Sequence, residues 1–362
     1  MFMDETTLPD YARGAAILGA GGGGSTRVGL LAALQAVEEF GPVEVISVDD
    51  LPDDALVLPA AGLGSPDITL EKLGNPEQGV WMRTAMEKEL GRPAHALMAS
   101  EVGGSNALTP IVWAAHTGLP LLDADGMGRA FPEVQMVTMH LKGIPATPTA
   151  LVDERGHQMI FRDMDARWLE RSARAVAVAF GGFACTVDHP FTGAQARDCT
   201  IPGSVSRALH IGRVISETTH DRVATVMDRL GGHVLITGKI SDVERRTVDG
   251  FVRGNVLIDG VGEDRGRLVR VEIQNENLAV LEDGRVLASV PDIMTMLDSQ
   301  TSDVIFTEEL RYGQRVTLVA LPSPDVWRTD AGLELVGPRA FGYDFDYTPV
   351  EELLAQREGG SA

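Results

Sequence analysis

Three short apolar runs in the first half of the chain each end in a glycine-rich polar loop. The runs and their loops are 55–61 with 62–66, 94–99 with 100–106, and 119–122 with 123–129. Segments with helical spacing of apolar residues lie between them, at 78–90 and 107–116. Such alternation predicts an α/β fold in which helices cover both faces of a mixed, mostly parallel sheet. Because ligands bind outside the carboxyl ends of parallel strands, we expect the three loops to converge.

A run of glycines lies upstream, between a predicted helix at 8–18 and a second at 25–40 that precedes a strand at 43–48. Backbone N–H groups at a helix N-terminus attract anions. We therefore expect an anion or substrate to contact the loop through Gly21, Gly22, Gly23, Gly24 and Ser25, the alternative being a tight structural turn. The loop formally matches the dinucleotide fingerprint, but it follows a poor strand, and it lacks the lysine of a phosphate-binding loop. No nucleotide cofactor is expected.

The second half of the chain has a different pattern. Helices are predicted at 166–180 and 204–216. Short alternating strands follow at 233–240, 251–258, 268–274, 278–281, 285–290 and 314–321. The pattern predicts an N-terminal α/β domain over residues 1–165, a C-terminal β-rich α+β domain over 166–355, and a disordered tail at 356–362.

Composition restricts the partners. The chain has 52 acidic and 31 basic side chains and a net charge of −21, which repels nucleic acid and anionic lipid. No apolar run approaches the roughly 20 residues of a membrane span, and the N-terminus lacks a signal-peptide pattern. Two cysteines are too few for a disulfide framework. We expect a cytoplasmic protein that binds a small molecule, neither nucleic acid nor membrane, and that forms a homo-oligomer, as many such enzymes do.

The loop at 100–106 combines a carboxylate, two glycines, a serine and an amide. Glu101 is a candidate general base or metal ligand, and Ser105 and Asn106 are candidates for substrate binding. The alternative is that Asn106 caps the next helix and Glu101 is only solvated.

The loop at 123–129 is the second acidic candidate. Asp123 and Asp125 are spaced to share a cation or to act in catalysis, and Arg129 is suited to bind a substrate carboxylate. His140 follows this loop, so the candidate ligand set for a divalent ion, zinc first, is Glu101, Asp123, Asp125 and His140. The alternatives are a solvated acidic turn and a packed histidine.

Three further segments carry weaker signals. Cys185 and His189 could form half of a metal site, but no second pair lies nearby. The segment 274–277 places amides and a carboxylate at a strand end, where they either face the pocket or form a polar turn. The segment 337–343 is expected to fold back against a core or the site.

The motifs at 17–24, 101–106, 123–133 and 337–343, taken in this order, resemble the S-methyl-thiohydantoin desulfurase family. The resemblance covers nearly the whole chain. It implies an N-terminal α/β domain, a C-terminal β-rich domain, and a place in hydantoin and oxoproline metabolism beside hydantoinase and oxoprolinase proteins. The implied reaction is hydrolytic removal of sulfur from C2 of a thiohydantoin or its S-methyl form.

Such a reaction needs a base, a group that stabilises charge on a ring nitrogen, and an anchor. We assign the base to Glu101, or a water-activating ion to Glu101, Asp123 and Asp125. Asn106 is expected to bind the ring, and Arg129 with the glycine-loop amides to hold a carboxylate or ring oxygen. The alternatives are a ring-opening amidohydrolase acting on a hydantoin or lactam, a non-catalytic partner subunit of a hydantoinase- or oxoprolinase-type enzyme, and, more weakly, a nucleotide-dependent enzyme.

Overall fold

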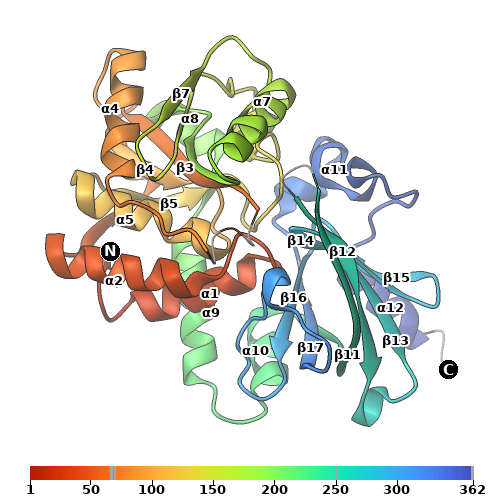
Figure 1. Cartoon of the computed structure of the whole chain (residues 1–362). Helices are drawn as coiled ribbons and strands as arrows, with labels where there is room; N and C mark the ends of the chain where they lie inside the picture. Colours follow the sequence, from red (N-terminus) through yellow and green to blue (C-terminus); the bar gives the residue numbers. More distant parts are fainter. Residues whose placement is uncertain (66–67, 69–70, 249–250, 360–362) are drawn as a thin grey trace.

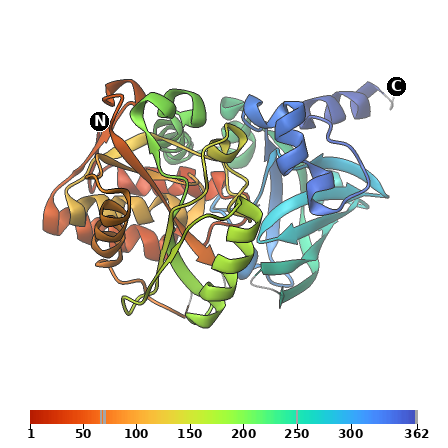
Figure 2. The same cartoon turned by 90° about the horizontal axis from the view of Figure 1, so that it is seen from above.

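A computed structural model describes residues 1–65, 68, 71–248 and 251–359. Two β-sheets lie side by side, the first surrounded by helices and the second accompanied by the helices of the C-terminal part (Figures 1 and 2). The α/β class and the β-rich C-terminal part are confirmed.

The first sheet is mixed. Its main order is β1 (Phe2–Met3), β2 (Val43–Ile46), β5 (Leu121–Asp125), β4 (Ala96–Ala99), β3 (Leu56–Gly64), β8 (Phe183–Val187), β6 (Thr149–Val152) and β7 (Gln158–Phe161). Two short strands, β9 (Phe191–Thr192) and β10 (Ile201–Pro202), pair with β3 and β5. The four strands β2, β5, β4 and β3 run parallel to one another. Every other pairing among the described strands of this sheet is antiparallel. The parallel part is therefore smaller than the sequence pattern predicts.

The helices around this sheet are α1 (Leu8–Leu18), α2 (Thr26–Phe40), α4 (Gln78–Leu90), α5 (Thr109–Thr117), α6 (Thr138–Leu141), α7 (Ala166–Ala179), α8 (Gly193–Cys199) and α9 (Ser204–Glu217). Six of them follow predicted segments, and the short helices α6 and α8 were not predicted. Helices α1 and α9 cross closely because each carries a glycine at the contact. A Cβ atom at Gly14 would lie 1.7 Å from the carbonyl oxygen of Ala208, and one at Gly212 would lie 1.7 Å from that of Asp10. No side chain fits at either position.

The second sheet is antiparallel throughout. Its order is β15 (Arg285–Ser289), β14 (Glu276–Glu282), β13 (Leu268–Gln274), β12 (Phe251–Gly260), β11 (His233–Val248), β17 (Arg315–Leu321) and β16 (Ile293–Asp298). Helices α10 (Arg222–Leu230), α11 (Asp330–Val336) and α12 (Val350–Gly359) accompany it. The six predicted strands are present, β11 is longer than predicted, and β16 was not predicted. The segment 337–343 packs Phe341 and Tyr343 against the core beside this sheet.

Segments from both sides of residue 165 build the first sheet, because β8, β9 and β10 belong to it. The division at residue 165 stays a prediction. Helix α12 extends to Gly359 and so includes part of the predicted disordered tail, whereas residues 360–362 lie outside the described residues. Among the described helices, none combines the length and the apolar character that a bilayer crossing requires.

The two sheets are joined at the glycine-rich loop. The Asn277 N–H donates to the Ala20 carbonyl at 2.8 Å, and the Thr307 N–H donates to the Gly21 carbonyl at 2.8 Å. The Thr295 hydroxyl donates to the Ile17 carbonyl at 2.9 Å. The loop therefore lies directly against the second sheet, which brings residues of both parts to one cleft.

Candidate active site

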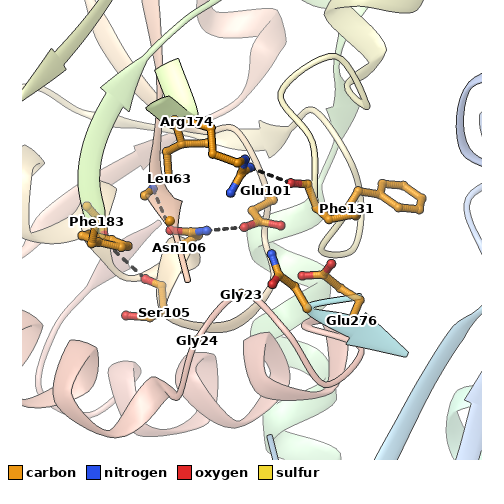
Figure 3. Close-up of a pocket in the computed structure, with 15 residues that line it drawn as sticks. Gly23, Gly24, Leu63, Glu101, Ser105, Asn106, Phe131, Arg174, Phe183 and Glu276 are labelled. Atoms are coloured by element: carbon orange, nitrogen blue, oxygen red, sulfur yellow. Dashed lines mark hydrogen bonds between the residues drawn. The ribbon is translucent and has the colours of Figure 1, made fainter. Parts of the chain in front are cut away.

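A cleft lies between the carboxyl ends of β3 and β4 and the start of β14 (Figure 3). Its lining comes from both parts of the chain. The lining residues are Gly23, Gly24, Gly62, Leu63, Gly64, Glu101, Ser105, Asn106, Thr109, Phe131, Pro132, Arg174, Phe183, Asn275 and Glu276. Of the predicted site residues, the cleft thus brings together Glu101, Ser105 and Asn106 with the glycines 23 and 24.

Glu101 follows β4 and is only 5% exposed. The Asn106 amide donates to its Oε1 atom, while the Asn106 Oδ1 atom accepts from the Gly62 N–H at 2.8 Å. The Phe131 N–H also acts on this carboxylate, although no donor of the described residues lies in normal hydrogen-bond geometry to the Oε2 atom of Glu101. Burial and the nearby Glu276 raise the pKa of Glu101 well above its ordinary value. Asn106 thus positions a carboxyl group whose second oxygen remains available.

Glu276 opens β14 in the second sheet and is 2% exposed. Burial raises its pKa from 4.5 to about 8, although the positive charge of Arg129 and N–H groups that include Gly23 act in the opposite direction. Figure 3 shows the Glu101 and Glu276 side chains entering the same space from different elements. Two buried carboxyl groups that interact titrate together, so this pair retains a proton at neutral pH.

Arg129 lies behind the cleft rather than in its lining. Its guanidinium is fully buried and donates from Nη1 to the carbonyl oxygens of Pro291 at 3.0 Å and Asp292 at 2.6 Å. These bonds fasten the 123–129 loop to the second sheet. Its charge also acts on Glu276 and Glu101, so it supports the carboxyl pair electrostatically.

The glycine-rich loop is packed against the second sheet. A Cβ atom at Gly22 would lie 2.1 Å from the Glu276 Oε1 atom, and one at Gly21 would lie 2.6 Å from the Asn277 Nδ2 atom. The Ser25 N–H donates to Glu308 Oε1 at 3.0 Å, and the Gly23 N–H bonds to Glu276. Two of the amides expected to bind an anion are therefore bonded to carboxylates of this chain. A role for the loop in substrate binding stays a prediction.

The aspartates of the 123–129 loop lie outside the cleft lining. Asp125 is fully buried, and its Oδ2 atom accepts from the N–H groups of Val102, Met127 and Gly128 at 2.9, 3.2 and 2.7 Å. Burial raises its pKa to about 6. Asp123 accepts from the N–H and hydroxyl of Ser206 at 3.0 and 2.5 Å, in the first turn of α9. Asp123 thus lies away from Glu101, whereas the charge of Asp125 contributes to raising the pKa of Glu101 although Asp125 is outside the cleft lining.

The described residues contain no group of three or more His, Cys, Asp or Glu side chains that could hold a metal ion. His140 lies beside His189 and is absent from the cleft lining. Cys185 is buried, and burial raises the pKa of its thiol to about 12, so it is protonated at neutral pH. The divalent ion stays a prediction.

Comparison with known sequences identifies the family to which the chain belongs. The S-Me-THD-like N-terminal domain matches residues 6–163, and the S-Me-THD-like C-terminal domain matches residues 164–350. The chain belongs to the S-methyl-thiohydantoin desulfurase family. The resemblance seen in the sequence motifs is thus confirmed, and a thiohydantoin-related role follows from the family name.

An X-ray structure of a protein from Chromobacterium violaceum has the same fold as this family member. The TM-score is 0.79 at 24% sequence identity, over 97% of this chain and 100% of that chain. No curated protein matches the chain.

Sequence reasoning missed Arg174 and the aromatic residues of the cleft. Arg174 lies on α7, donates from Nη2 to the Pro132 carbonyl at 3.0 Å, and packs over the Phe251 ring at 3.9 Å. It is one of several charged residues on an amphipathic helix, so nothing local distinguishes it. Glu276 belongs to the segment 274–277, for which the pocket was one of two interpretations, and the structure places Asn275 and Glu276 in the lining.

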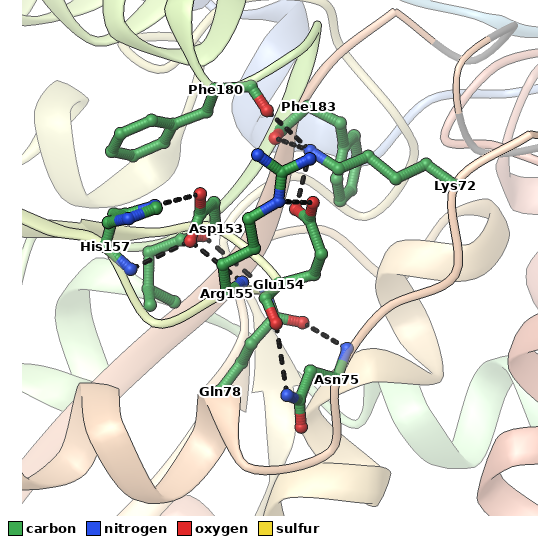
Figure 4. Close-up of polar contacts among 10 residues, drawn as sticks. Lys72, Asn75, Gln78, Asp153, Glu154, Arg155, His157, Phe180 and Phe183 are labelled. Atoms are coloured by element: carbon green, nitrogen blue, oxygen red, sulfur yellow. Dashed lines mark hydrogen bonds and ion pairs between the residues drawn. The ribbon is translucent and has the colours of Figure 1, made fainter.

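The wall at Phe183 is held by a polar network (Figure 4). The Lys72 ammonium donates to the carbonyl oxygens of Phe180 at 2.6 Å and Phe183 at 3.4 Å. It also pairs with Glu154 Oε2 at 2.6 Å. Lys72 therefore fastens the turn that carries the Phe183 ring into the cleft.

Proposed function

We propose that this protein is a hydrolase that removes sulfur from C2 of a thiohydantoin or S-methyl-thiohydantoin ring. One observation carries the proposal: Glu101 and Glu276, two buried carboxyl groups with raised pKa values, enter one cleft from the two sheets. A pair that shares a proton supplies a base and an acid at neutral pH, as addition of water to a C=N bond requires. Family membership supports the class of ring.

The cleft suits a flat ring. Gly23, Gly62 and Gly64 present main chain without side chains, and Phe183 contributes aromatic surface, whereas the Phe131 ring points away from the cleft and packs on Arg129 and Trp327. Backbone amides and carbonyls next to glycines can approach a small heterocycle closely. We assign the ring to this space, with Asn106 at its polar edge.

In the proposed first step, ionised Glu101 accepts a proton from water as the water oxygen bonds to C2. The electrons of the C2=N bond move to the ring nitrogen, which takes a proton from Glu276. We assign the base to Glu101 because the Asn106 amide donates to it, and such a bond favours the ionised form. Arg129 lies behind both groups and stabilises the transient negative charge.

In the second step the C2–S bond breaks, and the leaving sulfur takes the proton held by Glu101. The hydroxyl group on C2 loses its proton to Glu276 as the carbonyl forms. The products are the hydantoin and methanethiol, or hydrogen sulfide when the unmethylated ring reacts as its C2-thiol tautomer, which carries the same C2=N bond, and both carboxyl groups return to their starting states.

The test is product analysis on a small panel of thiohydantoins and S-methyl-thiohydantoins, with thiol release and hydantoin formation measured together. Equal amounts of thiol and hydantoin, lost in Glu276→Gln, are the expected result. An open-chain carbamoyl product would contradict desulfuration and favour the ring-opening amidohydrolase. Binding without turnover, together with co-purification of a hydantoinase-type enzyme, would favour the partner-subunit alternative.

A further inference from the structure

The Phe183 ring lies along strand β3 where that strand borders the cleft. Phe183 pairs with Gly64 in the register of β3 and β8. A Cβ atom at Gly64 would lie 3.0 Å from the Phe183 Cδ2 atom, and one at Gly62 would lie 2.4 Å from the Phe183 Cζ atom. The ring therefore extends from Gly64 to Gly62 and occupies the space that side chains at these two positions would fill.

The tip of this ring reaches Asn106. A Cβ atom at Gly62 would lie 2.4 Å from the Phe183 Cζ atom and 2.9 Å from the Asn106 Oδ1 atom, so both atoms border the same point. The amide nitrogen of Asn106, on the other branch of its side chain, donates to Glu101. Phe183 and Glu101 therefore lie on different sides of Asn106, as Figure 3 also shows.

This order places the aromatic ring at the end of the cleft opposite the carboxyl pair. Glu276 interacts with Glu101, and both line the cleft together with Phe183. In the proposed reaction, C2 of the substrate ring faces the two carboxyl groups, and the polar edge of the ring faces Asn106. The atoms C4 and C5 lie across the five-membered ring from C2, so they face Phe183.

The space between these groups is small. The cleft encloses about 70 Å³. Pockets that hold drug-sized ligands enclose roughly 300–1,000 Å³. The wall at Phe183 is also fastened from behind, because the Lys72 ammonium donates to the carbonyl oxygens of Phe180 and Phe183. A ring whose backbone is held in this way limits the size of the group that C5 can carry.

We propose that Phe183 determines substrate specificity by excluding rings with a bulky C5 substituent. The substrate class is then the thiohydantoins and S-methyl-thiohydantoins that carry hydrogen or a methyl group at C5. This inference rests on the proposed desulfuration for the orientation of the ring, whereas the size limit itself rests on the cleft lining.

The test compares the parent with Phe183→Ala on S-methyl-thiohydantoins that carry a methyl or a benzyl group at C5, by kcat/KM for thiol release. The parent should prefer the methyl form. Phe183→Ala should lower kcat/KM several-fold on the methyl form and raise it roughly tenfold or more on the benzyl form, because one methylene in an apolar pocket is worth roughly 10- to 200-fold. A residue with a merely structural role would lower both values together, and that result would overturn the proposal.

Phe180→Ala is the matched control. Phe180 lies on the same turn, but it is absent from the cleft lining, and its ring centroid lies 6.3 Å from that of His157 (Figure 4). This variant should keep the parental ratio of the two kcat/KM values. If Phe183→Ala does not fold, Phe183→Leu, which keeps a smaller apolar side chain, should change the ratio in the same direction.

Calorimetric titration with the two corresponding hydantoins, which are the products, separates this proposal from the proposed function. If no thiol is released, but the parent binds the methyl hydantoin more tightly and Phe183→Ala reverses that order, the proposed reaction is wrong and the size limit holds. If thiol is released and the parent and Phe183→Ala have the same ratio of kcat/KM values, the size limit is wrong and the proposed function stands. Absence of both thiol release and hydantoin binding would overturn both.

Discussion

The loops at 100–106 and 123–129 are similar in sequence but have different roles. Both follow neighbouring parallel strands, and both combine acidic residues with glycines. In the first, Glu101 keeps one carboxylate oxygen unpartnered among the described residues and faces a cleft. In the second, the Oδ2 atom of Asp125 accepts from three backbone N–H groups, and its Oδ1 atom, although also without a hydrogen-bond partner among the described residues, lies outside the cleft lining. Asp125 therefore supports the backbone of its loop, whereas Glu101, at the cleft, can take part in chemistry.

The difference has a structural cause. The 123–129 loop is covered by segments that follow it in the chain. Strand β10 pairs with Asp125, the Trp327 indole donates to the Met127 carbonyl at 2.7 Å, and a Cβ atom at Gly128 would lie 2.5 Å from Pro324. The glycine-rich loop packs on the 100–106 loop at Gly103 and Gly104 but leaves Glu101, Ser105 and Asn106 in the cleft lining, so of these two acidic loops this one contributes its side chains to the cleft.

The largest expected effect is on turnover. Glu101→Gln should lower thiol release roughly 10²- to 10⁴-fold, because it removes the base while preserving the shape of the side chain. Asp123→Asn, a change in the other loop outside the cleft, should retain near-parental turnover. A Glu101→Gln variant with full activity, measured at the same folded fraction by circular dichroism, would remove Glu101 from the mechanism.

The next effect is on stability. Asp125→Ala should lower the free energy of unfolding by about 3 kcal/mol or more, because it leaves three N–H groups without their acceptor. Asp125→Asn keeps an acceptor oxygen and should retain most of that stability. Urea unfolding of both variants measures the difference. If Asp125→Ala has the same free energy of unfolding as the parent but no turnover, then Asp125 acts in the reaction and the proposed difference between the two loops is wrong.

Glu276→Gln should increase stability in a pH-dependent way. The pKa of Glu276 is about 8 in the folded chain and 4.5 ordinarily, so between these values the folded chain holds a proton that the unfolded chain has released. The free energy of unfolding therefore falls as pH rises from about 4.5 to about 8. The neutral variant avoids this loss and should gain on the order of 4 kcal/mol at pH 8 and almost nothing at pH 4.5. Urea unfolding at both pH values measures this gain in the free energy of unfolding. An equal gain at each pH would argue against burial of Glu276 as the cause of its raised pKa.

The smallest effect concerns the cleft wall. Lys72→Met should raise KM a few-fold with kcat nearly unchanged, because it releases the turn that carries Phe183. The control is Arg155→Ala, which removes a 75% exposed partner of the same Glu154. Steady-state kinetics on both variants separates an effect of the Phe183 turn from an effect of losing a partner of Glu154. A matching rise of KM in the control would assign the effect to Glu154 rather than to the wall.

Much of the first half could be predicted from local pattern. Apolar runs ending in glycines placed β3 and β4 and located Glu101, Ser105 and Asn106 at the edge of the parallel strands. That inference works because strand direction and the position of a loop at a strand end are local properties. Family membership was also predictable, since the motifs extend along the whole chain.

The roles of Asp125, Arg129 and Glu276 depend on contacts between distant parts of the chain. Arg129 contacts carbonyl groups more than 160 positions later in the chain. The partners of Asp125 can be identified only once the conformation of the 123–129 loop is known. The sequence placed Glu276 in a polar segment but offered no means of choosing between a turn and a pocket. These outcomes follow from tertiary packing, which single-sequence periodicity does not encode.

The contact between Gly22 and Glu276 links two positions that lie far apart in the chain. The Glu276 carboxyl occupies the space in which any side chain at position 22 would begin. Among relatives, a residue other than glycine at this position should therefore appear only together with a shorter residue at the position of Glu276. An acidic residue there should in turn always be accompanied by glycine. A replacement of Gly22 alone should not be tolerated, whereas the same replacement combined with a shorter residue at position 276 should be.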